Sequence, residues 1–213
     1  SACKYLDYIN DGEIIIINDG STDNSLQVIE DYIHNNYTDE GFIKVISYKT
    51  NRGVCHARNI GVKKANNDWI LFLDSDDELI NTGESSFKII SNYLNDGDVH
   101  FFACVNDKNE IVGSKLPGSN KVSLDNLIIK GTRGESIPII KKSLLLKYPY
   151  EEDLLGMEGL TYLKMVKERG YATLHSIPLR KYFENHSDRL SSNNQMLMRS
   201  YDIYLGYKRM LKL

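Results

Sequence analysis

The sequence predicts an α/β fold in which a Rossmann-like, mostly parallel sheet is flanked by helices. Two continuous apolar runs carry this prediction, EIIIIN at residues 13–18 and WILFL at residues 69–73. Uninterrupted runs of this kind are typical of strands that are buried on both faces, as in a parallel sheet. Segments with helical spacing of apolar residues lie between them, so strands and helices alternate along the chain.

The elements of the first half follow from local patterns. Turn-forming residues at 18–23 end the first strand, and apolar residues at helical spacing then predict a helix over about 25–37. Residues 42–47 alternate as a strand does, and residues 55–65 predict a second helix. Because ligands bind beyond the carboxyl ends of strands in such sheets, one crevice could hold both 18–23 and the acidic segment 74–77.

The second half is less regular and predicts a mixed sheet. Recurring glycines make residues 113–137 a loop-rich segment. A helix over 157–169 is expected to end at Gly170. The remaining predicted elements are a helix at 87–94, a strand at 99–105, a hairpin turn at 106–109, strands at 171–175 and 179–183, and a closing helix at 195–213.

The composition is that of an ordinary globular protein. Hydrophobic residues make up 41% and charged residues 26% of the 213 residues, which argues against a disordered or fibrous chain. The net charge of −3, with scattered basic residues, predicts no nucleic-acid partner. No apolar run approaches the ~20 residues that a transmembrane helix requires. The distant cysteines Cys3, Cys55 and Cys104 predict no disulfide framework or zinc site, so we expect a cytoplasmic protein.

The acidic segment Asp74-Ser75-Asp76-Asp77 places three carboxylates directly after a predicted buried strand. Like charges so close together are unfavourable unless a cation or hydrogen bonds offset them. Carboxylate oxygens favour Mg²⁺ or Mn²⁺ over zinc. The alternative is a helix N-terminus, where aspartates cap backbone N–H groups. Taken alone, this segment supports both interpretations equally.

A second polar segment, Asn18 to Asp23, has two interpretations as well. The simpler is a capped turn between strand and helix, with Gly20 adopting a backbone angle that other residues avoid. The functional one is a carboxylate, Asp19, aimed at the edge of a nucleotide base. Considered alone, the simpler interpretation is favoured.

Three motifs in order decide between these alternatives: IINDGSTDNS at 16–25, NRGVCHARNIG at 51–61 and ILFLDSDD at 70–77. With these motifs the chain resembles family 2 of the bacterial glycosyltransferases, closely over 13–80 and more loosely elsewhere. The resemblance implies the GT-A fold. It also implies transfer of a sugar from a UDP-sugar to a saccharide or lipid-linked acceptor, with inversion, in cell-surface polysaccharide synthesis.

The resemblance also implies roles for individual residues. A Mn²⁺ or Mg²⁺ ion would be held by Asp76 and Asp74, with His186 as a further ligand. The implied nucleotide-binding residues are Asp19, Gly20, Ser21, Arg58, Asp74 and Ser75. The family carries its catalytic base in an acidic pair at a helix start, which falls on Glu158 and Gly159. Glu158 is therefore the candidate base, and Asp153 is the reserve.

Two departures from the family pattern leave other functions open. Gly159 replaces the second acid of the pair, which suggests as an alternative a nucleotide-sugar-binding remnant without turnover. A sugar nucleotidylyltransferase is less favoured, because no glycine-rich basic loop is visible. Relatives also begin with a central strand that residues 1–9 do not match, so we expect that this strand lies outside the sequence.

The chain is expected to form one structural domain with two halves. Residues 1–100 would bind the donor nucleotide sugar and residues 101–192 the acceptor. Residues 193–213 would form a C-terminal helix that packs on the domain, on a second copy in a homodimer, or on the inner face of the membrane as a peripheral contact.

Overall fold

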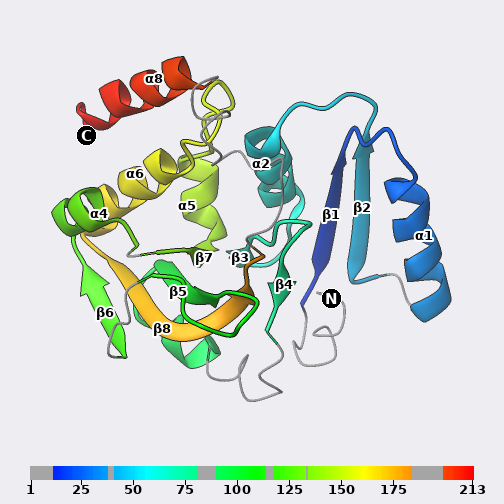
Figure 1. Cartoon of the computed structure of the whole chain (residues 1–213), viewed down its shortest axis with the longest axis horizontal. Coiled ribbons are helices and arrows are strands. Elements are labelled where there is room, and N and C mark those ends of the chain that lie inside the picture. Colours follow the sequence, from blue (N-terminus) through cyan, green and yellow to red (C-terminus); the bar gives the residue numbers. More distant parts are fainter. Residues whose placement is uncertain (1–11, 38–40, 81–89, 114–117, 133, 184–198) are drawn as a thin grey trace.

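The computed structural model describes residues 12–37, 41–80, 90–113, 118–132, 134–183 and 199–213. Its strands form two separate sheets (Figure 1). In the smaller sheet, β1 (Ile14–Asp19) pairs in parallel with β2 (Ile43–Tyr48). The isoleucine run therefore forms the strand that its sequence predicts.

Helices cover both faces of the smaller sheet. Alternate side chains of a strand point to opposite faces, and Ile14 and Ile16 pack against Ile33 of α1 (Ser25–Asn36). Ile17 points to the opposite face, where Gly61 of α2 (Val54–Lys64) lies against it. Helix α2 thereby comes to lie between the smaller sheet and the rest of the molecule (Figure 1).

The larger sheet is mixed. Its strands lie in the order β3 (Trp69–Leu71), β7 (Ser136–Lys141), β5 (Val99–Val105), β8 (Ala172–Lys181) and β4 (Glu78–Leu79), and β6 (Ser119–Val122) pairs with β8. Strands β5 and β8 pair in parallel, whereas the other pairings of this sheet are antiparallel. The α/β class and the mixed second half agree with the prediction.

Strands β1 and β3 do not pair with each other. Among the described strands, β1 pairs with β2 alone and β3 with β7 alone. The parallel sheet that was expected to join them is therefore not formed by these residues. The prediction that a central strand lies outside the sequence stays a prediction.

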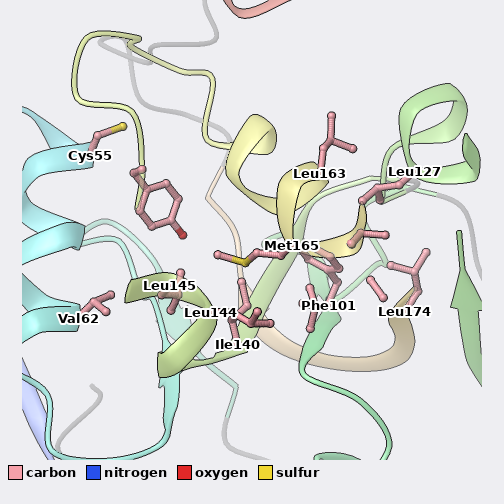
Figure 2. Packing of buried hydrophobic residues seen from close by; sticks show 14 residues of the cluster. Cys55, Val62, Phe101, Leu127, Ile140, Leu144, Leu145, Leu163, Met165 and Leu174 are labelled. Carbon is pink, nitrogen blue, oxygen red and sulfur yellow. The ribbon is translucent and has the colours of Figure 1, made fainter. Parts of the chain in front are cut away.

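The main core lies between the larger sheet and four helices of the second half. These helices are α4 (Leu124–Lys130), α5 (Lys142–Lys147), α6 (Gly159–Arg169) and α8 (Ser200–Met210), all on one side of the sheet (Figure 1). Met165 of α6 lies among Leu144, Leu145, Ile140 and Phe101 (Figure 2). Phe102 and Cys104 of β5 point the other way into a second cluster with Ile139. The strand β5 is therefore buried on both faces, and the strand expected at 99–105 is confirmed.

Two predictions about the second half are wrong. The segment 113–137 contains β6 and α4 as well as loops. Ser123 caps the start of α4 by accepting the backbone N–H of Asn126. The strands expected at 171–175 and 179–183 are one strand, β8, which stays paired with β5 through irregularities in the register. The end of α6 at Gly170 is confirmed, with the left-handed φ of 87° that favours glycine.

Within the part of the chain that the structure describes, no helix is both long enough and apolar enough to cross a membrane.

Candidate active site

The acidic segment forms a tight turn after β3. The backbone N–H of Asp77 donates to the carbonyl of Asp74 at 3.1 Å. The Asp77 side chain is only 5% exposed and points inward, whereas Asp76 is exposed and Asp74 is 43% exposed. Strand β4 follows the turn, so the alternative of a helix N-terminus is wrong. The turn directs Asp74 and Asp76 outward, with Ser75 exposed between them.

Asp19, at the end of β1, ties the first motif to the second. Its carboxylate accepts hydrogen bonds from the backbone N–H groups of Arg52 (3.0 Å) and Gly53 (2.7 Å). Gly20 makes this close approach possible, because a Cβ built there would lie 2.4 Å from the backbone nitrogen of Asn51. A carboxylate has about four acceptor positions. Asp19 can therefore hold this loop and still accept a donor from a ligand.

The turn at 18–23 is also structured by its own side chains, as the simpler interpretation predicts. The side-chain oxygen of Asn18 accepts the backbone N–H of the exposed Ser21 at 3.1 Å. The Asn18 side-chain amide donates to the hydroxyl of Ser47 on β2 at 3.0 Å. Local hydrogen bonds therefore hold this segment, while the Asp19 carboxylate keeps acceptor positions to spare.

Arg58 of α2 brings two predicted site residues together. Its Nη2 lies 2.8 Å from Oδ1 of Asp74, and its Nη1 lies 3.8 Å from Oε1 of Glu158. The guanidinium also lies against the rings of Phe72 and Tyr150, with centroid distances of 5.7 and 5.6 Å. Burial lowers the pKa of Arg58, but the adjacent Asp74 carboxylate together with the hydroxyl groups of Tyr162 and Tyr150 outweighs it, so the pKa is raised. The positive charge of Arg58 is therefore held where α2, the acidic turn and the residue before α6 meet.

Glu158 and Asp153 are placed differently. Glu158 immediately precedes α6, is 22% exposed and faces Arg58 without capping the helix through its side chain. Asp153 is 62% exposed and forms an ion pair with Arg209 of α8, with Nη1 and Oδ1 3.1 Å apart. The geometry therefore favours Glu158 over Asp153 for a role beside Asp74.

Sequence reasoning missed two residues of α2 that hold the loop before Glu158. The side-chain amide of Asn59 donates to the carbonyl of Tyr150 at 2.9 Å, and its oxygen accepts the N–H of Tyr150 at 2.9 Å. His56 Nδ1 lies 2.9 Å from Oε2 of Glu152, and Oε1 of the same carboxylate accepts from the side-chain amide of Asn59 at 2.9 Å. Asn59 follows Arg58 within the ARN motif, and this position was the signal that could have identified it.

The carboxylates of Asp74 and Asp76 are suitable ligands for a divalent cation whose other ligands come from a bound substrate. Within the described residues, no group of three or more His, Cys, Asp or Glu side chains could hold a metal ion. Two outward carboxylates on one turn supply the hard oxygen ligands that Mg²⁺ and Mn²⁺ prefer, and such sites are completed by phosphates and water. His186, the third predicted ligand, lies outside the described residues.

Comparison with known proteins identifies the family. A model described as Glycosyl transferase family 2 matches residues 1–113. The chain belongs to this family. The GalNAc(5)-diNAcBac-PP-undecaprenol beta-1,3-glucosyltransferase of Campylobacter jejuni is 26% identical over 210 residues, covering 95% of the chain and 64% of that relative. A poly-beta-1,6-N-acetyl-D-glucosamine synthase of Staphylococcus aureus is 36% identical over 169 residues, covering 75% and 39% respectively. This glycosyltransferase chain thus spans less than two thirds of either relative.

Solved structures share the fold of this glycosyltransferase. S. aureus TarS in complex with UDP-GlcNAc matches with a TM-score of 0.67 and 21% identity, over 90% of this chain and 57% of TarS. A mannosyltransferase from Pyrobaculum calidifontis in complex with GDP-Man and Mn²⁺ matches with a TM-score of 0.63 and 13% identity, over 94% and 55% respectively. These likenesses confirm the GT-A fold, which is an α/β fold with a mixed sheet flanked by helices.

Proposed function

We propose that this chain transfers a sugar from a UDP-sugar to a hydroxyl group of a saccharide or lipid-linked acceptor, in the synthesis of a cell-surface polysaccharide. The observation that carries the proposal is the meeting of Asp74 and Glu158 around Arg58. The acidic turn proposed to bind the donor and the candidate base Glu158 are distant in sequence, but both contact the guanidinium group of Arg58. The UDP-GlcNAc complex of TarS and the names of the two relatives support the same donor and acceptor classes.

The donor would be held at the carboxyl ends of β1 and β3. Asp19 would accept a hydrogen bond from the uracil ring, and Arg58 would contact the base or the phosphates. Gly20, Ser21, Asp74 and Ser75 complete the proposed nucleotide site. Asp76 and Asp74 would hold Mn²⁺ or Mg²⁺, with His186 as a further ligand. When bound, this cation would neutralise charge on the diphosphate leaving group.

Glu158 would act as the general base. As the acceptor oxygen bonds to the anomeric carbon, the carboxylate of Glu158 takes the hydroxyl proton, and the bond from that carbon to the UDP oxygen breaks. Attack from the face opposite to UDP inverts the anomeric configuration. Asp153 remains the reserve, but its ion pair with Arg209 would have to open first. Residues 1–100 would thus serve the donor, and residues 101–192 the acceptor.

Nucleotide binding tests the donor side. Calorimetry with UDP, UDP-GlcNAc, UDP-glucose and GDP-mannose, with and without Mn²⁺, should show uridine-specific binding that depends on the cation. Asp76→Ala should abolish the Mn²⁺-dependent part, because Asp76 is the exposed acid of the turn. Asp107→Ala, which removes an exposed acid from another turn, is the matched control and should bind as the wild type does. Unchanged binding by Asp76→Ala would refute the metal assignment.

The rate of sugar transfer to an acceptor tests the proposed role of Glu158. Glu158→Gln should lower the transfer rate by roughly 100-fold or more, the usual contribution of a general base, while the UDP affinity changes less than about twofold. Glu168→Gln, on the far end of α6, is the control. If the wild-type chain binds UDP-sugars but neither transfers nor slowly hydrolyses them, the remnant without turnover is the correct function. Gly159, which stands in place of an acid, motivates that alternative.

We further propose that the protein acts in the cytoplasm at the inner face of the membrane. Tyr201, Tyr204 and Tyr207 of α8 are 69%, 59% and 55% exposed, and tyrosines favour boundaries between apolar and aqueous surroundings. Flotation with lipid vesicles tests this contact. A homodimer formed through the same helix would instead appear as a doubled mass in light scattering.

A further inference from the structure

Arg180 of β8 is a buried arginine whose three side-chain nitrogens all have partners. Its side chain is 8% exposed, and its Nη1 lies 2.9 Å from a carboxylate oxygen of Asp77. Its Nη2 donates to Glu135 at 3.0 Å, and its Nε donates to the sulfur of Cys104 at 3.1 Å. A buried guanidinium is costly unless it is paired and hydrogen-bonded. The side chain is therefore held in one orientation.

Through Asp77, Arg180 fixes the acidic turn. The Asp77 carboxylate is 5% exposed, and its backbone N–H closes the turn on Asp74. The backbone around the turn is anchored to the same strand, because Leu79 lies opposite Arg180 in the pairing of β4 with β8. Asp74 and Asp76 thus project outward from a turn whose inward side chain is bound to β8.

Through Glu135, Arg180 also holds the segment that precedes β7. Glu135 is 44% exposed, so one end of this network reaches the surface and the other is buried. Burial raises the pKa of the Cys104 thiol to about 11, so this partner is neutral at pH 7. The single positive charge of Arg180 is therefore shared by the carboxylates of Asp77 and Glu135.

We infer that Arg180 is a positioning residue for nucleotide-sugar binding: it orients the acidic turn through Asp77 and couples it to Glu135. The inference rests on the proposed function, because it concerns the same donor site. Arg180 does not itself face the donor. It fixes the distance and direction of the Asp74 and Asp76 carboxylates, on which cation-dependent binding of a nucleoside diphosphate would depend.

The test compares substitutions of Arg180 with the substitution of a mostly buried, ion-paired carboxylate elsewhere. Arg180→Met removes the charge and its hydrogen bonds, whereas Arg180→Lys keeps the charge but lacks the planar fork of donors that reaches Asp77, Glu135 and Cys104. The control is Glu13→Gln in the smaller sheet. The Glu13 carboxylate is 11% exposed, lies 2.9 Å from Lys44 and accepts the backbone N–H of Asn67 at 2.9 Å. Substitution at either position should destabilise the fold, but of these two residues Arg180 is the one that contacts the acidic turn.

The measurements are Tm, the affinity for UDP by calorimetry over a Mn²⁺ titration, and KM and kcat for sugar transfer. We expect Arg180→Met to weaken UDP binding in Mn²⁺ at least tenfold, to raise the Mn²⁺ concentration needed, and to raise KM more than it lowers kcat. Arg180→Lys should be intermediate. Glu13→Gln should lower Tm without changing either affinity.

A second variant separates the effect of Arg180 on the orientation of the acidic turn from its effect on the stability of the protein. In Arg180→Met with Asp77→Asn, no carboxylate is left buried without its cation, so Tm should recover while UDP affinity stays low. Wild-type affinity in Arg180→Met or in this double variant would overturn the inference, as would an equal loss of affinity in Glu13→Gln. If the wild-type protein binds no nucleotide, the proposed function fails and this inference fails with it. Binding by the wild type that Arg180→Met leaves intact overturns this inference alone.

Discussion

Two buried histidines, His100 on β5 and His175 on β8, belong to one chain of hydrogen bonds inside the larger sheet. His100 Nε2 lies 3.2 Å from the carbonyl of Gly97, His100 Nδ1 lies 3.0 Å from His175 Nε2, and His175 Nδ1 lies 2.8 Å from the hydroxyl of Ser119. Because a carbonyl only accepts, His100 Nε2 carries a hydrogen. His175 Nε2 then donates to His100, and Ser119 donates to His175. Both rings are neutral in this arrangement.

Protonation of His175 would break this chain, so we predict that acid destabilises the fold. Burial first, and the neighbouring His100 second, lower the pKa of His175 from 6.5 to about 4. Above pH 6.5 the ring is neutral whether the chain is folded or not. Between pH 6.5 and 4 the unfolded chain binds a proton that the folded chain does not, so the free energy of unfolding falls as the pH falls. At about 1.4 kcal/mol per pKa unit, the loss is about 3 kcal/mol.

The measurement is urea unfolding of the wild type and of His175→Phe at pH 7.5, 5.5 and 4.5. Phenylalanine keeps the stack on Phe102, whose ring centroid lies 4.3 Å from that of His175, but it cannot bind a proton. The raised pKa of Asp77, about 6, acts in the opposite direction, because its protonation favours the folded state, and it is present in both proteins. The stability advantage of the wild type should therefore shrink by roughly 2–3 kcal/mol between pH 7.5 and 4.5. An advantage that stays constant to within about 0.5 kcal/mol would refute the reasoning.

Two further predictions concern glycines. Gly20→Ala should cost more than about 3 kcal/mol in urea unfolding, because it adds a backbone clash with Asn51 to the strain of a φ of 76°. Gly170→Ala has a φ of 87° but open space around the Cβ, so it should cost only about 1 kcal/mol, and equal losses would contradict the clash. Gly206 of α8 lies against Met157, because a Cβ built at Gly206 would lie 2.3 Å from that side chain. Gly206→Val should therefore displace Met157 and lower the rate of sugar transfer more than it lowers the affinity for UDP. Met157→Ala in the same chain should restore transfer, and a failure to do so would exclude this contact as the cause.

The positions of the two polar segments on the proposed donor side could be predicted from sequence, because both are short segments that directly follow apolar strands. The apolar runs before Asp19 and Asp74 mark strands, and the polar residues that follow mark their carboxyl ends. The inward direction of Asp77 could not be predicted in this way. It depends on Arg180, which lies far along the chain on β8, and no local pattern links the two.

The second half was less predictable because tertiary pairing overrides its local signals. Pro178 within β8 marks a break by local rules, yet the strand continues because β5 pairs with it on both sides of the irregularity. Helix α4 has seven residues and a single buried side chain, Leu127, so its sequence carries little helical periodicity. The positions of Glu158 and Asp153 could be named from the sequence, but the choice between them needed the partners Arg58 and Arg209.

Helix α2, which carries the second of the three motifs, connects the chain segments that build the candidate site. Its N-terminus meets Asp19 through the N–H of Gly53, Arg58 reaches Asp74 and Glu158, and Asn59 holds the backbone of Tyr150. These side chains contact different neighbours, because consecutive residues of a helix point in different directions. Arg58 and Asn59 of the ARN sequence are therefore constrained by different parts of the candidate site. Substitution of Arg58 should accordingly affect donor binding and the surroundings of Glu158 together, whereas substitution of the exposed Asp76 should affect donor binding alone.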